Sequence, residues 1–364
     1  MLDPATIHID PCFRDFYDIV FIDEKWFYLT RKCSTYYLLP GEEEPYRTCK
    51  NKNFIMKVMF LCALARPRMD NEGNCIFDGK IGCFPLVTYE PARRSSKNRV
   101  AGTLQMKPIT SVTKDVMRAF IIDKVIPAIR AKWPSEDVGK PIFIQQDNAR
   151  PHIDPSDPLF AQAAQQDGFN IQLICQPPNS PDFNILDLGF FASIQSIQFK
   201  NATKTIPDIV NVVQREFEKY SPVLSNRIFV TLQTVMVEVM KIGGGNNYKT
   251  PHINKASLER EGKLPLQMKC DRHLVREVCV QLERMNVHSG RKLVKLNFGY
   301  ANMSRVKLYF GPCTYVLLSG CLIDHDVFCT KESSIFSYVL ANLGAFVFMM
   351  QKYNLPCVLH ATCI

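Results

Sequence analysis

The sequence lacks the patterns by which cysteine and histidine bind zinc or build a disulfide framework. Its 14 cysteines include no CxxC pair, and no two of its histidines stand at the H-x₃₋₅-H spacing of zinc ligands. The N-terminus has neither the basic segment nor the apolar segment of a signal peptide. We therefore expect no zinc site and no secretion, and we expect reduced thiols in a reducing compartment.

Long apolar runs and a large excess of one charge are also missing. The most membrane-like stretch, residues 335–350, is shorter than the roughly 18 residues that a spanning helix needs, so we expect a buried helix and no membrane association. The net charge of +9 is weak evidence for a nucleic-acid partner. A length of 364 residues, 46% of them hydrophobic, excludes a disordered or fibrous protein and allows about two packed domains.

Short apolar segments alternate with helical ones through the first two thirds of the chain. The patterns predict strands at residues 19–22, 36–39, 54–65, 141–144 and 171–174, and helices at residues 111–132, 158–166 and 207–240. Residues 70–107 are rich in Gly, Asn and charge, which is typical of an inserted loop region with a short hairpin. The alternation predicts an α/β fold with a parallel or mixed sheet covered by helices.

Acidic residues follow two of the predicted strands. Asp23 comes directly after the strand at residues 19–22, and Asp147 follows the strand that begins at Pro141. Strand ends are where open α/β sheets commonly place ligand and active sites. Either residue taken alone is better explained as a capping or surface aspartate, so the surrounding sequence has to decide.

Three segments around these acids resemble the catalytic core of mariner-type DNA transposases, and the match is close to the plant-like branch. They read FIDEKWF at residues 21–27, QDNARPH at 146–152 and QPPNSPDFNILD at 176–187. The 39 residues between Asp147 and Asp187 equal the spacer that this branch uses between its second and third catalytic aspartates. A further segment, GGGNNYK at 243–249, is similar to the family's C-terminal signature, so the resemblance covers roughly residues 1–285.

The resemblance implies an RNase H-like mixed sheet flanked by helices, in which Asp23 and Asp147 lie on the sheet and Asp187 on a following helix. Such a cluster of carboxylates suits two Mg²⁺ or Mn²⁺ ions, which activate a water or a 3′-hydroxyl for in-line displacement at phosphorus. Asp182 is the rival for the third position, but its place favours a helix cap. The implied activity is metal-dependent DNA strand cleavage and strand transfer in cut-and-paste transposition.

The other motif residues have supporting roles in this hypothesis. Glu24 and Lys25 either contact the scissile phosphate or form a surface ion pair. Asn148 and His152 would orient a metal ligand or contact the DNA backbone, and Arg150 would bind phosphate. A basic run and the cations upstream of it predict a DNA channel, with solvated loops as the alternative. These cations are Arg93, Arg94, Lys97 and Arg99 in the run, and Lys50, Lys52, Lys57, Arg66 and Arg68 upstream.

We expect a catalytic core at residues 1–250, the family's C-terminal segment at 251–290 and a Cys-rich apolar tail at 291–364. The tail resembles no part of the family and is typical of translated intron or a shifted reading frame. Only 22 residues precede Asp23, so we expect a truncated copy that lacks the family's N-terminal helix-turn-helix region.

The family further implies binding to element ends and target DNA, a homodimer and a nuclear site of action. A different class of function remains open, because one sequence cannot show whether the aspartates are still used. The alternative is a catalytically inactive transposase-derived protein that binds DNA or another partner.

Overall fold

The computed structural model describes residues 1–288 except 8, 31–37, 44–50, 52–53, 98 and 202, and five short strands beyond them. The chain divides into two units, Met1–Val275 and Arg276–Ile364. In the second unit β10 (Val294–Phe298) pairs with β11 (Val306–Leu308) and β14 (Leu359–Ala361), and β12 (Val316–Leu318) pairs with β13 (Cys321–Ile323). The predicted helix at residues 335–350 lies outside the described residues.

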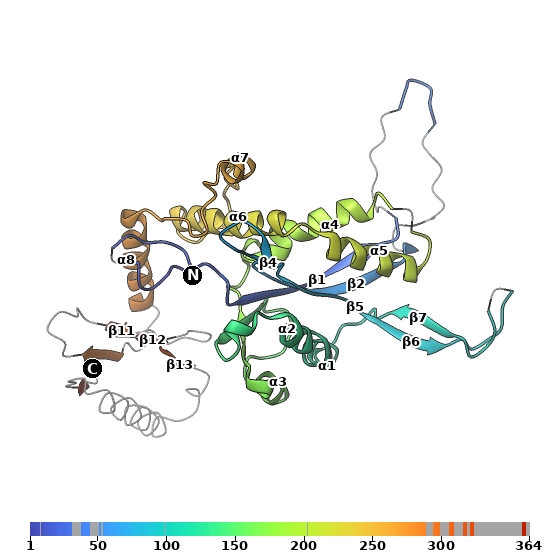
Figure 1. The fold of residues 1–364 in the computed structure, drawn as a ribbon, viewed down its shortest axis with the longest axis horizontal. Coiled ribbons are helices and arrows are strands. Elements are labelled where there is room, and N and C mark those ends of the chain that lie inside the picture. The colour runs from blue at the N-terminus through green and yellow to red at the C-terminus, as the bar shows by residue number, and fades with distance from the viewer. Residues whose placement is uncertain are drawn as a thin grey trace. The chain divides into compact units, whose positions relative to one another are not determined.

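Five strands of the first unit form a mixed sheet in the order β5-β2-β1-β8-β9 (Figure 1). Three of them, β1 (Ile19–Tyr28), β2 (Lys57–Ala65) and β5 (Lys80–Pro85), pair antiparallel in a meander. The other two, β8 (Pro141–Gln146) and β9 (Asn170–Cys175), run parallel to β1. This order and these directions give the RNase H-like sheet that the sequence predicted.

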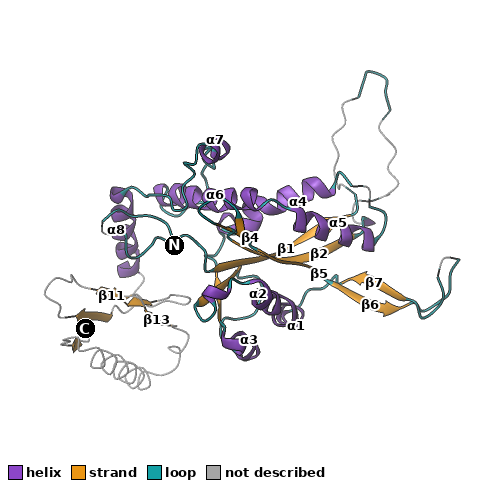
Figure 2. Ribbon diagram, viewed as in Figure 1, coloured by secondary structure: helices purple, strands orange, loops and turns teal. Residues whose placement is uncertain are grey.

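Helices cover both faces of the sheet, because side chains that alternate along each strand are apolar on both sides (Figure 2). On one face Phe21 packs edge-on against Phe229, with ring centroids 5.7 Å apart. The elements on this face are the π-helical turn η6 (Leu186–Phe190), α4 (Phe191–Gln198), α5 (Ile206–Lys219) and α6 (Pro222–Lys241).

The opposite face carries Val20 and Ile22, which are fully buried against a second set of helices. These are α1 (Lys114–Phe120), the π-helical turn η2 (Ile121–Val125), α2 (Ile126–Lys132) and α3 (Pro158–Ala164). Asp157 caps α3 by accepting hydrogen bonds from the backbone N–H groups of Leu159 and Phe160. The sheet is therefore the middle of three layers, and β1 is its central strand.

The remaining elements are short connections and terminal helices. They are the 3₁₀ turns η3 (Ser135–Asp137), η4 (Gln166–Gly168) and η5 (Pro181–Phe183), and the helices α7 (Lys255–Arg260) and α8 (Arg272–His288). Among the described helices α6 alone is long and apolar enough to cross a membrane, and its Phe229, Leu232 and Val235 are buried in the core. The described cysteines are free thiols.

The predicted insert at residues 70–107 is only partly an insert. Two strands, β3 (Arg68–Met69) and β4 (Cys75–Phe77), form a small hairpin, but residues 80–85 form β5 of the central sheet. Strand β5 was missed because Gly82 and Cys83 interrupt its apolar pattern. The predicted hairpin is formed by β6 (Val87–Pro91) and β7 (Leu104–Pro108).

The strand predicted at residues 36–39 is not found where it can be checked. Residues 38 and 39 are not in a strand, and residues 36 and 37 lie outside the described part of the chain. The other predicted strands and helices that lie in the described residues are confirmed with bounds that shift by one to a few residues, except that the helix predicted at 207–240 is divided into α5 and α6 at Tyr220 and Ser221, because Pro222 begins a new helix. The largest such change is in β1, which continues six residues beyond Ile22.

Gly79 lies in the turn that leads into β5 and cannot accept a side chain without strain. Its φ is +75°, and a Cβ there would come within 2.1 Å of the Ala65 carbonyl oxygen. We expect Gly79→Ala to lower the free energy of unfolding by about 3 kcal/mol, through the backbone strain and the clash together. Urea unfolding measures the change.

Gly102 supplies the matched control, because its φ is +86° but no atom lies within 4 Å of the added Cβ. Gly102→Ala should therefore cost only about 1 kcal/mol. Equal losses in the two variants would contradict the predicted clash with strand β2.

Candidate active site

Asp23 and Asp147 lie abreast on neighbouring parallel strands. The ladder between β1 and β8 pairs Phe21 with Gln145, and each aspartate follows two residues later. Strand β8 ends at Gln146, as predicted, so Asp147 is the first residue after it. Asp23 is not at a strand end as predicted, because β1 continues to Tyr28 along β2, where Asp23 is paired with Cys62.

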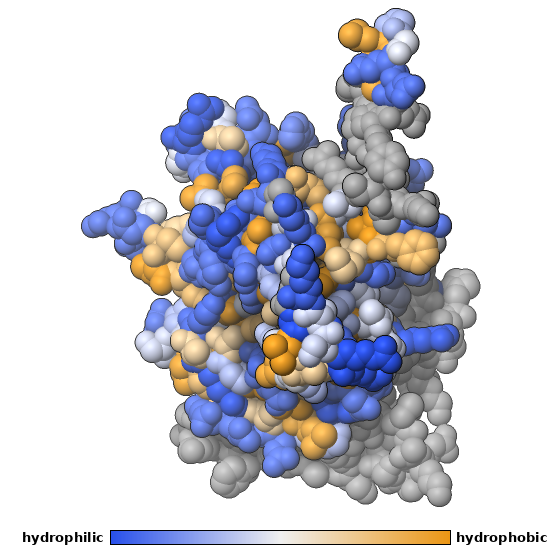
Figure 3. Space-filling view, turned by 90° about the vertical axis from the view of Figure 1, so that its right-hand side faces the viewer, coloured by the Kyte–Doolittle hydropathy of each residue, from blue (hydrophilic) through white to orange (hydrophobic). Residues whose placement is uncertain are grey.

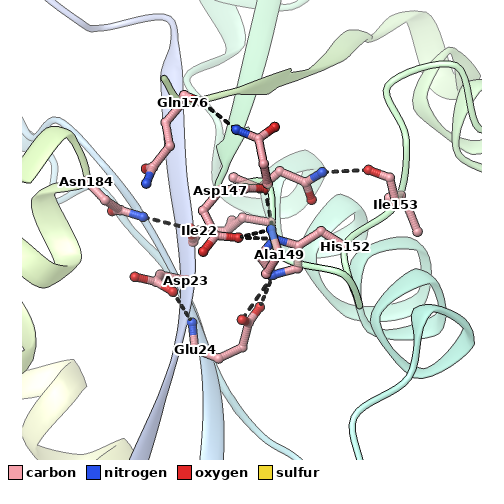
Figure 4. Close-up of polar contacts among 11 residues, drawn as sticks. Ile22, Asp23, Glu24, Asp147, Ala149, His152, Ile153, Gln176 and Asn184 are labelled. Carbon is pink, nitrogen blue, oxygen red and sulfur yellow. Dashed lines mark hydrogen bonds and ion pairs between the residues drawn. The ribbon is translucent and has the colours of Figure 1, made fainter. Parts of the chain in front are cut away.

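Asp23 and Glu24 point to opposite faces of the sheet, because side chains alternate along a strand (Figure 4). Asp23 shares the face of Phe21, which is covered by η6 and α4 to α6. Glu24 points towards His152, which lies in the loop after β8 (Figure 4). The adjacent acids therefore face different partners.

Asp187 is the second residue of η6 and lies close enough to Asp23 to affect its charge. Burial, followed by repulsion from the carboxylates of Asp187, Glu24 and Asp147, raises the pKa of Asp23 to about 8. A single hydrogen bond, from the Glu24 N–H at 2.7 Å, opposes this rise. The structure thus brings the three predicted aspartates into one electrostatic group, in which burial and the neighbouring carboxylates keep Asp23 protonated at neutral pH.

His152 bridges Asp147 and Glu24. Its side chain is 3% exposed, with Nε2 at 3.1 Å from Glu24 Oε2 and Nδ1 at 2.5 Å from Asp147 Oδ1. Burial opposes the charged imidazolium, but the hydrogen bonds to Asp147 and Glu24 outweigh it and raise the pKa of His152 to about 11. A protonated His152 orients the two carboxylates and is unsuited to act as a general base.

The same contact affects Asp147. The hydrogen bond from His152 lowers the pKa of Asp147 below its usual value, and burial opposes this change. The side chain of Asp147 remains 40% exposed, so it is open to solvent while Asp23 is largely covered. Asp23 and Asp147 therefore differ in protonation at neutral pH although they lie abreast.

The remaining motif residues are placed around this group. Asn148 donates from Nδ2 to the Gln176 carbonyl at 2.8 Å, which ties the loop after β8 to the end of β9. Arg150 is exposed on that loop. Lys25 is on the Asp23 face, with Nζ 5.3 Å from the centroid of the Phe191 ring. Asn148 therefore supports the loop of Asp147, whereas phosphate contacts of Lys25 and Arg150 stay predictions.

The prediction that Asp182 caps a helix is wrong, because neither Ser180 nor Asp182 caps the turn that begins there. Asp182 instead accepts a hydrogen bond of 2.5 Å from the Tyr248 hydroxyl. The cap of the next turn is Asn184, whose Oδ1 accepts from the Leu186 N–H at 3.1 Å. Asp182 therefore anchors the segment after α6 to the loop that leads to Asp187.

Two buried amides near the acids had no assigned role in the sequence. Asn184 and Gln145 are each 1% exposed; Asn184 lies in a loop and Gln145 lies in strand β8. A polar residue at a core position of a strand, such as Gln145 two residues after Phe143, was the available signal.

The donor set suits a hard divalent cation in its chemistry. Carboxylate oxygens are the ligands that Mg²⁺ and Mn²⁺ prefer, and the raised pKa of Asp23 shows negative charge that a cation would stabilise. Within the described residues, however, no three Asp, Glu, His or Cys side chains are close enough together to hold a metal ion. Asp23, Asp147 and Asp187 are thus grouped but are not arranged as a finished metal site.

Several of the predicted DNA-contacting cations are not available to DNA. Arg66 is completely buried, and the Arg68 guanidinium is enclosed by Tyr17, Phe77 and Trp133 and pairs with Asp137. Lys57 stacks its ammonium group 4.0 Å from the centre of the Trp26 ring. The assignments of Arg66 and Arg68 are wrong because these two cations, which follow the strand that ends at Ala65, turn into the core. Lys50 and Lys52 lie outside the described residues.

The basic run is more exposed than Arg66 and Arg68, because it forms the tip of the β6–β7 hairpin. Arg93, Arg94 and Lys97 are exposed there, and Arg99 is half-buried. Figure 3 looks onto the end of the first unit that carries this hairpin, and hydrophilic side chains cover most of the described surface in view. A phosphate-binding role of these four cations stays a prediction.

Asp23→Asn should stabilise the chain in a buffer free of divalent cations. Because the pKa of Asp23 is raised to about 8, the folded state takes up a proton that the unfolded state does not, and stability falls as pH rises from 4 to 8. We expect the variant to gain about 2 kcal/mol in the free energy of unfolding at pH 8.5. The gain should shrink as pH falls towards 4, which urea unfolding across that range measures. A gain that does not depend on pH would contradict a raised pKa of Asp23 as its cause.

No protein-family model and no curated protein matches the sequence. Solved structures do match. A pre-cleavage Mos1 transpososome matches with a TM-score of 0.46 and 15% identity, over 64% of this chain and 58% of that chain. The Mos1 strand transfer complex matches with a TM-score of 0.45 and 17% identity, over 64% and 56%.

The Mos1 transposase catalytic domain with Raltegravir and Mn matches with a TM-score of 0.41 and 14% identity, over 64% of this chain and 86% of that domain. The chain spans little more than half the length of the Mos1 chains in the complexes. In the Mos1 transposase paired-end complex with the left transposon end the share is 53%. In structure, this chain is similar to the catalytic domain of the Mos1 mariner transposase.

Proposed function

We propose that this chain is the catalytic core of a mariner-type DNA transposase of the plant-like branch, which cleaves DNA strands and transfers them to a target. The observation that carries the proposal is the electrostatic group of Asp23, Asp147 and Asp187 on an RNase H-like sheet. The three motifs around these aspartates and the 39-residue spacer between Asp147 and Asp187 support it.

In this proposal Asp23, Asp147 and Asp187 would hold two Mg²⁺ or Mn²⁺ ions. When bound, the ions would supply charge neutralisation and an activated water or 3′-hydroxyl for in-line displacement at phosphorus. The raised pKa of Asp23 keeps its free carboxyl protonated at neutral pH, so Asp23 would have to release that proton to serve as a ligand. His152 keeps its proton and holds Asp147 and Glu24 in place from the opposite face.

DNA would be held by cations around this group. Lys25 lies two residues from Asp23 on the same face, and Arg150 is exposed three residues after Asp147. The hairpin tip with Arg93, Arg94, Lys97 and Arg99 would contact the backbone without reading sequence. Element ends and target DNA as partners, a homodimer and a nuclear site of action belong to the same proposal, as do the core at residues 1–250 and the family segment at 251–290.

The test is strand cleavage by the purified full chain on DNA duplexes that carry candidate element ends. We expect cleavage with Mg²⁺ or Mn²⁺, none with a chelator, and joining of the released 3′ end to a second duplex. Asp147→Asn is the control for a contaminating nuclease, because it removes a proposed metal ligand and keeps the size of the side chain. Since Asp147 also pairs with the buried His152, urea unfolding first establishes that the variant is folded. Cleavage that persists in Asp147→Asn would overturn the assignment.

The alternative is a catalytically inactive protein that binds DNA or another partner. One observation favours it. The carboxylate of Asp147, a proposed metal ligand, is already engaged by a short contact with His152. A folded chain that retains DNA in a salt-dependent manner, but neither binds Mn²⁺ nor cleaves, would establish this alternative.

A further inference from the structure

Asn184 connects the two aspartates that are most distant in the sequence. Its amide nitrogen donates to the Ile22 carbonyl at 3.0 Å, and its amide oxygen accepts from the Leu186 N–H at 3.1 Å (Figure 4 shows the bond to Ile22). Ile22 directly precedes Asp23, and Leu186 directly precedes Asp187. One buried side chain thus joins the residues before both acids.

Gln145 ties the same loop to the second strand of the site. Its side chain is on the Phe143 face of β8, and its amide nitrogen donates to the Phe183 carbonyl at 3.0 Å. Phe183 directly precedes Asn184, and Gln145 is two residues before Asp147. The loop that delivers Asp187 is therefore bonded to β1 through Asn184 and to β8 through Gln145.

Amides suit this task better than charged side chains would. An amide both donates and accepts, so Asn184 satisfies a strand carbonyl and a helical N–H group at once. It does not titrate, and it adds no charge to a group whose carboxylates already repel one another. Buried as they are, both amides would leave an unpaired carbonyl if they moved, which holds the loop in one position.

We infer that Asn184 and Gln145 are positioning residues that fix Asp187 relative to Asp23 and Asp147. The inference rests on the proposed function and adds to it how the third aspartate is placed. Removing either amide should release the loop from one strand while leaving every proposed metal ligand in the chain. The expected effect is on the chemical step and on metal affinity, with DNA binding unaffected.

Gln198 provides a matched control on the same strand. It is fully buried on α4, and its amide nitrogen donates to the Tyr28 carbonyl of β1 at 3.2 Å. Tyr28 lies five residues beyond Asp23, at the end of the strand away from Asp147. Gln198→Ala therefore deletes the same kind of bond between helix and strand, but not next to the acids.

The experiment compares Asn184→Ala, Gln145→Ala and Gln198→Ala in the full chain. We expect all three to lose stability in urea, but only the first two to lower kcat of strand cleavage and Mn²⁺ affinity, each by about 10- to 100-fold with KM for DNA unchanged. Because both amides hold one loop, the double variant should lose less than the product of the two single effects. Asn184→Ser keeps an acceptor for the Leu186 N–H but cannot reach the Ile22 carbonyl. It should have the same activity as Asn184→Ala, and it provides a second test if Asn184→Ala does not fold.

The outcomes separate the inference from the proposed function. If the wild-type chain cleaves and Asn184→Ala and Gln145→Ala match Gln198→Ala in kcat and Mn²⁺ affinity, the inference alone is overturned. If Asn184→Ser keeps full activity, the helix cap and not the bond to β1 is what matters, which also overturns it. A folded wild-type chain that neither cleaves nor binds Mn²⁺ overturns the proposed function, and the inference with it.

Discussion

Asp187→Asn is expected to lower strand cleavage by about a thousandfold or more, because the substitution removes one of three carboxylates that the proposed reaction needs for its divalent ions. The amide keeps the size of the side chain and removes its charge. Since repulsion from Asp187 contributes to the raised pKa of Asp23, the variant should also bring that pKa back towards its usual value. Cleavage assays and titration of the free chain measure the two effects.

Asp182→Asn is the matched control, five residues earlier in the same motif. Asp182 bonds to the Tyr248 hydroxyl at 2.5 Å and is not among the groups that act on Asp23. Its substitution should therefore leave the cleavage rate within a few-fold of wild type. A large loss in Asp182→Asn with near-normal cleavage in Asp187→Asn would exchange the two assignments and move the third catalytic position to Asp182.

Arg66→Ala is expected to lower the free energy of unfolding by about 4 kcal/mol, a large part of the stability of a typical domain. The Arg66 guanidinium is completely buried and donates to Asn226 Oδ1 at 2.9 Å and to the carbonyls of Asp15 and Leu266 at 2.7 and 2.9 Å. Its removal takes this donor from Asn226 Oδ1 and the Asp15 carbonyl and opens a cavity, while the Leu266 carbonyl keeps its hydrogen bond from Gln233. Urea unfolding of the two purified chains measures the loss.

Arg66 remains charged at neutral pH, because burial lowers its pKa only to about 10 and Tyr17 and Asp15 oppose that change. It therefore joins the N-terminal segment and the segment after α7 to β2 as a permanent cation. Arg94→Ala, at the exposed hairpin tip, is the control and should change stability by less than about 0.5 kcal/mol. If both variants unfold at the same urea concentration, the buried network does not stabilise the fold.

Much of the fold could be predicted from the sequence, because apolar periodicity follows directly from which faces of an element are buried. The runs at 141–144 and 171–174 predicted β8 and β9, and the helical spacing after Ser111 predicted α1 and α2. Strand β5 and the continuation of β1 beyond Ile22 could not be predicted in the same way. Both carry polar or small residues that are held in strands by pairing with β2, a partner distant in sequence.

The candidate site shows the same division. Its acids could be named as candidates from three motifs and one spacer, because each motif consists of residues that are adjacent in the sequence. Which face each acid occupies depends on strand register, which sets Asp23 towards Asp187 and Glu24 towards His152. The Asp182–Tyr248 bond joins residues 66 positions apart, and no local pattern predicts such a pair.

By itself the sequence determined the α/β class and most of the helices and strands, since these depend on local composition and spacing, and the resemblance of its motifs made the three aspartates candidates. Only the tertiary structure decided that Arg66 is a core cation and that Asn184 and Gln145 hold the loop of Asp187. The physical reason is that burial and hydrogen bonding across 38 to 162 residues are set by packing of the whole sheet, which chain neighbours do not encode.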